Sequence, residues 1–80
     1  MTPKLTKAEY AGDYRINIKF DDGVEGVIDM ENELWGEVFE PLKEKSQFQN
    51  FVLDKELQTI VWPTTGADLA PEFLYEQAAA

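Results

Sequence analysis

The chain has 80 residues, of which 7 are basic and 16 acidic, so its formal net charge is −9, and it contains neither cysteine nor histidine. Those two absences exclude disulfides, thiolate nucleophiles, Cys/His zinc sites and catalytic triads that need an imidazole. The hydrophobic content of 44%, with no long apolar run and no apolar stretch typical of a secretory signal, predicts one packed domain over residues 1–80 of a cytoplasmic protein that does not enter a membrane.

Alternating apolar and polar side chains over residues 14–20 and again over residues 24–30 predict a β-hairpin. A three-residue loop is favoured over a two-residue loop because it places apolar residues opposite one another on the inner face and opposite charges on the outer face. Gly23 is expected to adopt the left-handed conformation in this loop. Residues 5–10 can form a preceding strand, with a turn at residues 11–13. The predicted cross-strand partners are Phe20 with Val24, Ile18 with Gly26, Ile16 with Ile28, Lys19 with Glu25, and Arg15 with Asp29.

Negative charge is concentrated in residues 21–40, which contain eight acids and no base. Such a surface repels the phosphate backbone, so we expect no direct nucleic-acid partner. The acids can instead attract a basic protein, although solubility alone would also explain them. The acids that have no predicted partner across the hairpin, and that we therefore expect to bind another protein, are Glu31, Glu33, Glu37 and Glu40.

Apolar residues recur at helical spacing over residues 34–42, but Gly36 and Pro41 interrupt the pattern, which indicates one short helix or two turns. The Ser-x-x-Gln sequence at residues 46–49 has the form of a capping box and predicts another helical turn, which would bring Phe48 and Phe51 to the interior. The apolar stripe, expected in the core, consists of Leu34, Trp35, Val38, Phe39 and Leu42.

Residues 51–53 and 57–62 are rich in β-branched and aromatic side chains and predict a second hairpin around a polar turn at residues 54–56. Pro63 ends this hairpin, and Pro71 is expected at the first position of a final helix. The predicted fold class is therefore α+β, with element order β-β-β-α-β-β-α. Its five short strands are expected in one antiparallel or mixed sheet, with the short helices on one face.

Few side chains indicate catalysis or metal binding. The carboxylates near the first hairpin lack the spacing of a calcium-binding loop, so no metal site and no cofactor are predicted. The hydroxyls of Thr64, Thr65 and Tyr75 have no neighbouring histidine or lysine to activate them. We therefore expect a protein that is not an enzyme.

The most specific residue types stand in the C-terminal stretch, residues 62–75. Together with residues 13–14, 20–23 and 38–42 and with Asp29, this stretch resembles the small bacterial family labelled domain of unknown function 2442, whose tail reads approximately W-P-N-G-A-D-L-x-P-x-x-L-Y. The resemblance covers nearly the whole chain. In one departure, Thr64-Thr65 stands where the family usually has a single polar residue. The matching tail residues are Trp62, Pro63, Gly66, Ala67, Asp68, Leu69, Pro71, Leu74 and Tyr75.

The resemblance implies a binding module and supplies no catalytic residues. Some relatives carry this unit before a helix-turn-helix domain, and stand-alone members are often encoded beside another small protein, in an arrangement that looks like a toxin–antitoxin pair. We therefore predict a non-enzymatic protein-interaction module, the antitoxin-like or regulatory member of a two-protein unit, which binds a basic protein encoded nearby. The alternative is a small-molecule or metal sensor domain that lacks its output domain.

The family-motif residues are themselves expected to be structural. Trp62, at a strand end, could anchor the last helix onto the sheet. Asp68, just before Pro71, is placed to accept backbone N–H groups at the start of that helix. The residues to which we assign a structural role are Gly23, Trp62, Pro63, Gly66, Asp68, Pro71 and Tyr75.

Overall fold

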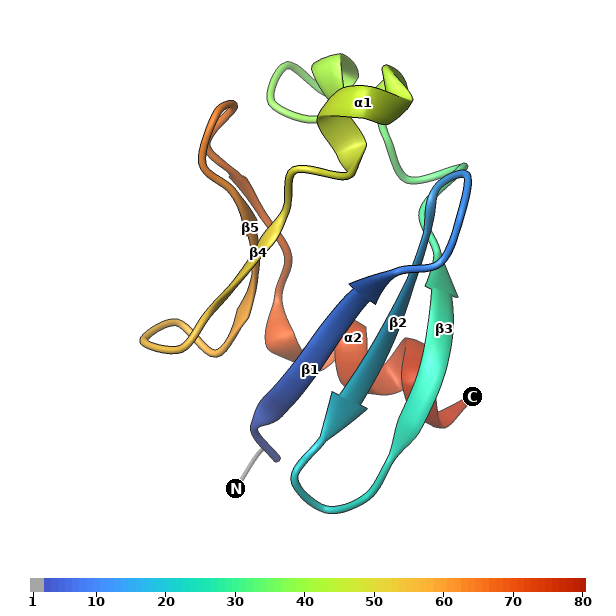
Figure 1. Cartoon of the computed structure of the whole chain (residues 1–80), viewed down its shortest axis with the longest axis vertical. Helices are drawn as coiled ribbons and strands as arrows, with labels where there is room; N and C mark the ends of the chain where they lie inside the picture. The colour runs from blue at the N-terminus through green and yellow to red at the C-terminus, as the bar shows by residue number, and fades with distance from the viewer. Residues whose placement is uncertain (1–2) are drawn as a thin grey trace.

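The computed structural model describes residues 3–80 and has an α+β fold (Figure 1). Its strands form two three-stranded antiparallel sheets, ordered β1-β2-β3 and β4-β5-β6. The elements in chain order are β1 (Leu5–Tyr10), β2 (Arg15–Phe20), β3 (Glu25–Asp29), the 3₁₀ helix η1 (Glu40–Lys43), α1 (Lys45–Phe48), β4 (Val52–Asp54), β5 (Thr59–Trp62), β6 (Ala67–Asp68) and α2 (Pro71–Ala79).

The first sheet has the predicted strands and register. The backbone N–H of Phe20 donates to the carbonyl of Val24 at 2.8 Å, and Gly23 has a φ of +93°, so the three-residue loop is confirmed. The remaining predicted partners also lie opposite one another across β2 and β3. Gly12 (φ +93°) and Asp13 (φ +48°) form the turn between β1 and β2 with left-handed backbones.

The predicted ion pairs across this hairpin are not formed. Arg15 instead binds the Asp13 carboxylate at 3.3 Å, and Glu25 accepts a hydrogen bond from the side-chain amide of Asn17 at 3.3 Å. Asp29 accepts a backbone N–H two residues further along the chain at 2.9 Å, which holds its carboxylate in the turn that follows β3. Register therefore placed the charges opposite each other, but local partners bind them.

The prediction of a single five-stranded sheet is wrong. β4 and β5 pair with each other and with a sixth strand, β6, which is only two residues long and was not predicted. The turn at residues 63–66 brings β6 back onto β5, where Gly66 donates to the Trp62 carbonyl at 2.8 Å and Leu69 donates to the Ile60 carbonyl at 3.1 Å. The apolar side chains of both sheets join one core, to which α2 contributes by packing against β3 and β2, so their burial does not require one extended sheet.

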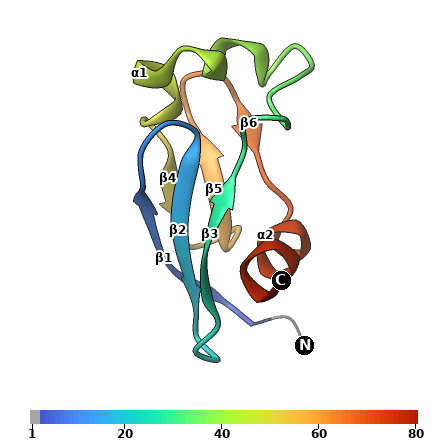
Figure 2. The same cartoon turned by 90° about the vertical axis from the view of Figure 1, so that its right-hand side faces the viewer.

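The two sheets lie opposite each other around one core (Figures 1 and 2). η1 and α1 lie across one end of both sheets, while α2 packs against β3 and β2, so the expected placement of all helices on one sheet face is also wrong. The fully buried large side chains come from both sheets and from all three helical segments: Ile16, Ile18, Phe20, Ile28, Met30, Leu42, Phe48, Ile60, Trp62 and Leu74.

The predicted apolar stripe over residues 34–42 is only partly in the core. Leu34 and Leu42 are buried, but Trp35 is 71% exposed and Val38 is 45% exposed. The reason is the turn at Gly36 (φ +91°), whose carbonyl accepts the N–H groups of residues 39 and 40, so no continuous helix presents the stripe on one face.

The predicted capping box at the start of α1 is wrong. Ser46 already lies inside the helix, and the carbonyl of Glu44 accepts the N–H groups of residues 47 and 48 without any side-chain cap. The helical turn itself is confirmed, and it buries Phe48 fully and Phe51 partly.

α2 begins at Pro71, as predicted, and approaches β3 closely. A Cβ added to Gly26 would lie 3.0 Å from the Cα of Ala78 and 2.8 Å from its carbonyl oxygen, and the second distance is one that real Cβ atoms essentially never show. Glycine at this position therefore lets the helix backbone rest directly on the strand.

Candidate functional site

A largely apolar groove of about 420 Å³ lies beside the 30–39 segment, the β6–α2 connection and the first turn of α2. We call this hollow the Trp35 groove. A pocket of this size is within the range of roughly 300–1,000 Å³ that binding sites for small molecules occupy. It is lined by Met30, Glu33, Trp35, Phe39, Asp68, Leu69, Ala70 and Phe73.

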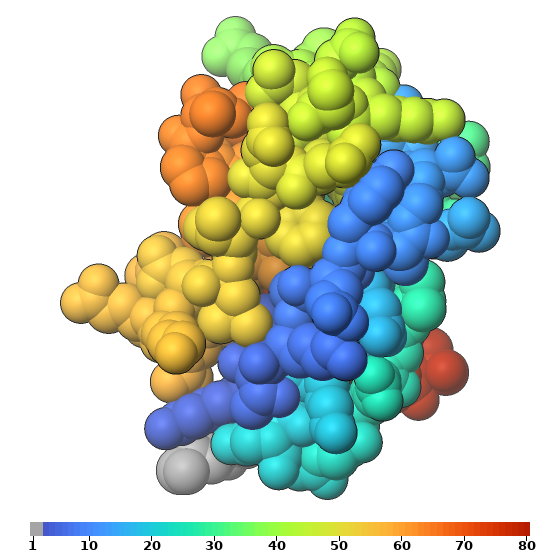
Figure 3. Space-filling model, viewed as in Figure 1, coloured from blue at the N-terminus to red at the C-terminus, as the bar shows by residue number. Residues whose placement is uncertain are grey.

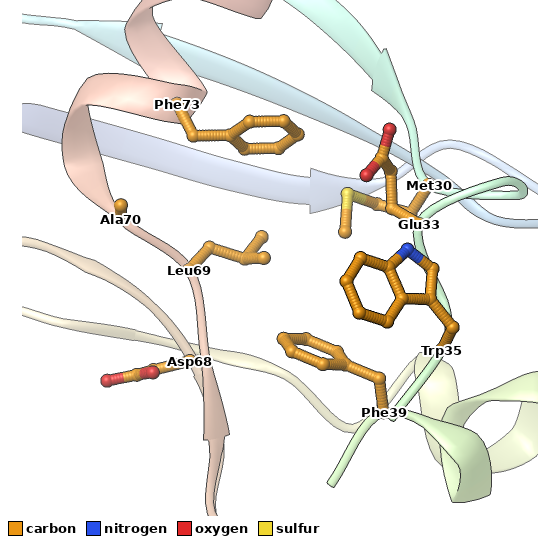
Figure 4. Close-up of a pocket in the computed structure, with 8 residues that line it drawn as sticks. All are labelled: Met30, Glu33, Trp35, Phe39, Asp68, Leu69, Ala70 and Phe73. Carbon is orange, nitrogen blue, oxygen red and sulfur yellow. The ribbon is translucent and has the colours of Figure 1, made fainter. Parts of the chain in front are cut away.

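Figure 4 shows how the apolar side chains of the groove are arranged. Leu69 and Phe73 project from the α2 side, and Trp35, Phe39 and Met30 face them from the other side. Met30 and Leu69 are buried and form part of the core, whereas Phe39 and Phe73 are half-buried. The groove is therefore a partly open extension of the hydrophobic core.

Trp35 owes its position to turns on both sides. Glu33 donates its backbone N–H to the Met30 carbonyl at 2.9 Å, and the Gly36 turn reverses the chain immediately afterwards. These turns point Leu34 into the core and leave the neighbouring Trp35 with 71% of its surface in solvent.

Phe39 connects the groove to the core. Its ring meets the fully buried Trp62 ring edge-on, with the ring centroids 6.4 Å apart. Trp62 in turn contacts the rings of Phe48 and Phe51. A side chain bound in the groove would thus rest on a wall that the aromatic core supports from behind.

The charge of the groove is entirely negative, because its two ionisable lining residues are Glu33 and Asp68. Both are exposed, and in Figure 4 the Asp68 carboxylate points away from the centre of the groove. An acidic rim around an apolar floor suits a ligand that combines positive charge with an apolar group.

The four acids predicted to bind a partner are all exposed but do not form one cluster. Glu33 lines the Trp35 groove, while Glu31 lines a separate polar hollow with Asp13, Arg15 and Lys45 among its neighbours. Glu40 pairs with Lys43 at 3.0 Å, and Glu37 stands near the Gly36 turn. Of the four, Glu33 is the one that the structure places at the groove, and whether any of them binds a protein stays a prediction.

Trp62 is fully buried and its indole N–H donates to the Phe48 carbonyl at 2.8 Å, so it ties α1 to the second sheet, a contact that was not predicted. The role predicted for Asp68 is wrong. Asp68 does not cap α2. The N-cap residue of α2 is Ala70, and no side chain forms a hydrogen bond to the helix start. Asp68 lies in β6 instead, where it is paired with Val61.

The other motif residues lie at turns and contacts. Pro63 and Gly66 (φ +80°) belong to the turn between β5 and β6, and Pro71 opens α2. Gly23 (φ +93°) lies in the loop between β2 and β3, next to Asp22, to which Tyr75 of α2 donates a hydrogen bond. That the role of these residues is structural stays a prediction.

Tyr75 tethers α2 to the first hairpin. Its hydroxyl donates to Asp22 Oδ2 at 2.6 Å, and its ring packs edge-on against Phe20 with centroids 5.0 Å apart. The hydrogen bond from Tyr75, followed by that from the Val24 N–H, lowers the pKa of Asp22, and the same bond to Asp22 raises the pKa of Tyr75. This tether helps to hold the helix that carries Phe73 into the groove.

Sequence reasoning missed Trp35, Phe73 and Leu69 as groove residues because all three appear as ordinary core positions. One signal could have indicated Trp35: Gly36 follows it directly and breaks the helical spacing on which its burial was predicted. The convergence of Phe73 with Trp35 joins segments about forty residues apart, which no local pattern reveals.

Within residues 3–80, no three acidic side chains converge as possible metal ligands. The described part of the chain also contains no helix long and apolar enough to cross a membrane.

A family model described as a protein of unknown function, DUF2442, matches residues 5–80. No curated protein and no solved structure matches the chain significantly.

Proposed function

The chain belongs to the DUF2442 family, and we propose that it is a non-enzymatic protein-interaction module that binds a basic segment of a partner protein in the Trp35 groove. The observation that carries this proposal is the exposure of Trp35, 71%, at the edge of an apolar hollow whose only charges are negative. Tryptophan is the residue type most enriched at the energetic centres of interfaces, because it buries a large apolar surface with few rotatable bonds.

The proposed partner segment is defined by the groove. Leu69, Phe39 and Phe73 would surround one inserted apolar side chain, and Trp35 would cover it. A lysine or arginine beside that anchor would meet Glu33, and the net charge of −9 would steer a basic partner toward this chain.

We further propose that the partner is a basic cytoplasmic protein encoded nearby and that the present chain is its antitoxin-like or regulatory counterpart. The support for this part is the family resemblance together with the acidic character of the chain. Co-expression with the neighbouring gene product should give a complex in size-exclusion chromatography that dissociates as salt is raised, because screening weakens attraction between exposed charges. Separate elution at low salt would contradict this assignment of the partner.

The groove itself can be tested without the partner, using a short peptide of lysine and leucine as the probe. Trp35 is exposed and Trp62 is fully buried, so a bound leucine should shift only the Trp35 emission to shorter wavelength and protect it from the neutral quencher acrylamide. Peptides in which serine replaces leucine, or glutamate replaces lysine, should bind about tenfold more weakly or not at all.

Two pairs of variants complete the test. Trp35→Ala should abolish binding, whereas Leu57→Ala, which removes another exposed large apolar residue, this one from the β4–β5 turn, should leave it unchanged. Glu33→Gln should weaken binding, whereas Glu56→Gln, in that same turn, should not. Equal effects of both members of either pair would contradict the groove as the binding site.

A small-molecule sensor is the second candidate, favoured by the volume of about 420 Å³ and the aromatic lining of the groove. A thermal-shift screen of apolar organic cations separates it from a docking module. A saturating ligand should raise the melting temperature of the wild-type chain and leave that of Trp35→Ala unchanged. The absence of a shift with any compound, alongside peptide binding, would contradict the sensor.

A further inference from the structure

A second groove, of about 720 Å³, lies between β1 and the β4–β5 hairpin, away from the Trp35 groove. Figure 3 views this side of the molecule, with the blue residues of β1 beside the gold β4–β5 hairpin. The groove is lined by residues of both sheets and is more polar than the Trp35 groove, with Thr6, Gln58 and Asp21 among its walls. We call it the edge groove.

The edge groove is bordered by two strands that each have an unpaired edge. β1 pairs only with β2, and β4 pairs only with β5, yet β1 and β4 lie close to each other on the same side of the molecule. An unpaired edge presents a row of N–H and C=O groups that can bind another extended chain.

The hydrogen-bond pattern identifies which backbone groups face outward on β1. Ala11 donates its N–H to the Arg15 carbonyl, so in this antiparallel pair Lys7 and Glu9, which follow the register shift between Leu5 and Lys7, bond to β2. The backbone groups of Ala8 and Tyr10 therefore point away from β2. Ala8 also lines the edge groove.

The same reasoning applies to β4. Ile60 and Trp62 use their carbonyls to bond with the segment around β6, so Thr59 and Val61 are the residues of β5 that bond to β4. Leu53, opposite Ile60, then has its backbone N–H and C=O directed toward the free edge. Leu53 lines the edge groove as Ala8 does.

The charge of the edge groove is opposite to that of the whole chain. Three of the seven basic residues, Lys4, Lys7 and Lys55, line it, against one acid, Asp21. Lys7 pairs with Glu9 at 3.1 Å, and Asp21 accepts the Lys4 backbone N–H at 3.1 Å, while Lys4 and Lys55 have no ion pair within residues 3–80.

We propose that the edge groove binds an extended acidic segment of another protein, which adds a strand to β1 or β4 and places its carboxylates against Lys4, Lys7 and Lys55. Main-chain hydrogen bonds to Ala8 or to Leu53 supply the backbone part of recognition, and the lysines select for acidic sequence. The same lysines repel an identical edge of a second copy, so they oppose self-association while they attract an acidic strand.

The net charge of −9 helps to distinguish a specific site from general attraction, because the chain as a whole should repel an acidic peptide unless a local site binds it. The probe is a short peptide of alternating glutamate and threonine, titrated at low salt into ¹⁵N-labelled protein. The expected result is a shift of the Ala8 amide resonance if the peptide extends β1, or of the Leu53 resonance if it extends β4, with slower hydrogen exchange at the residue that shifts. A peptide with lysine in place of glutamate should leave these two resonances in place. Unchanged Ala8 and Leu53 resonances with the acidic peptide would overturn the proposal.

Matched variants separate charge from strand addition. Lys55→Glu should weaken binding of the acidic peptide about tenfold, whereas Lys43→Glu, the same charge change in η1, should weaken it about twofold or less. A version of the acidic peptide with alternate amides N-methylated cannot pair as a strand and should not bind. Equal weakening by the two variants, or full binding of the N-methylated peptide, would overturn the proposal.

Discussion

The two tryptophans of this chain occupy opposite environments only one aromatic ring apart. Trp62 is fully buried, donates its indole N–H to Phe48 and is surrounded by three phenylalanine rings. Trp35 is 71% exposed and its indole N–H has no hydrogen bond within residues 3–80. Phe39 lies between the two regions. The difference shows where the chain has already gained the free energy of burying an indole and where that free energy is still available to a ligand.

Removing Trp62 should have the largest effect on stability. Trp62→Ala should lower the free energy of unfolding by about 3–5 kcal/mol, because it leaves a cavity among Phe39, Phe48 and Phe51 and an unpaired carbonyl at Phe48. Urea denaturation followed by circular dichroism measures this loss. A loss below about 1 kcal/mol would show that the Trp62 region is as tolerant as the surface.

Gly26→Ala should come next. The added methyl group would meet the backbone of Ala78 at 2.8–3.0 Å, and neither the strand nor the helix backbone can yield easily. We expect a loss of about 1–3 kcal/mol, the usual cost of overpacking. Because α2 also carries Phe73, the peptide affinity of the Trp35 groove should fall in parallel. Stability close to wild type would mean that the helix can shift away from β3 without cost.

Trp35→Ala should change stability by no more than about 0.5 kcal/mol, as is usual for exposed side chains. Acrylamide quenching of the same variant should lose its accessible component and retain the protected emission of Trp62. A large loss of stability would place Trp35 with the core and remove the contrast between the two tryptophans.

Tyr75→Phe should have the smallest effect, and pH reveals it best. Asp22 has a lowered pKa in the folded chain, so its contribution to stability is present at neutral pH and is lost as the pH falls below about 4. Tyr75 has a raised pKa, so its contribution is present below about pH 10 and is lost as the pH rises through its folded pKa.

The variant should raise the Asp22 pKa toward its ordinary value, with part of the lowering retained through the Val24 N–H at 3.0 Å. A ¹³C NMR titration of the Asp22 carboxyl group measures this change. An unchanged Asp22 pKa would show that the hydrogen bond does not persist in solution, and α2 would then depend on packing alone to support the groove.

Local patterns predicted the first hairpin down to its register, because the alternation of residues 14–30 and the need for a glycine at position 23 leave few alternatives. They did not predict β6, because a strand of two residues is too short to show an alternating pattern. Nor did they predict the division into two sheets, which depends on how side chains of different strands, such as Ile18 and Trp62, are buried in one core. The acid Glu33 was identified from charge alone, whereas its aromatic neighbours became visible only in three dimensions.

Both sheets pair only strands that are adjacent in the sequence. Every strand pairing can therefore form by closing a short loop, which costs little chain entropy. Pairing of neighbouring strands lowers the mean sequence separation of the contacts. We therefore expect this protein to fold faster than β-sandwiches in which consecutive strands belong to different sheets. The rings around Trp62 come from Phe39, Phe48 and Phe51, which lie 11 to 23 residues before it, so this aromatic cluster also joins nearby parts of the chain.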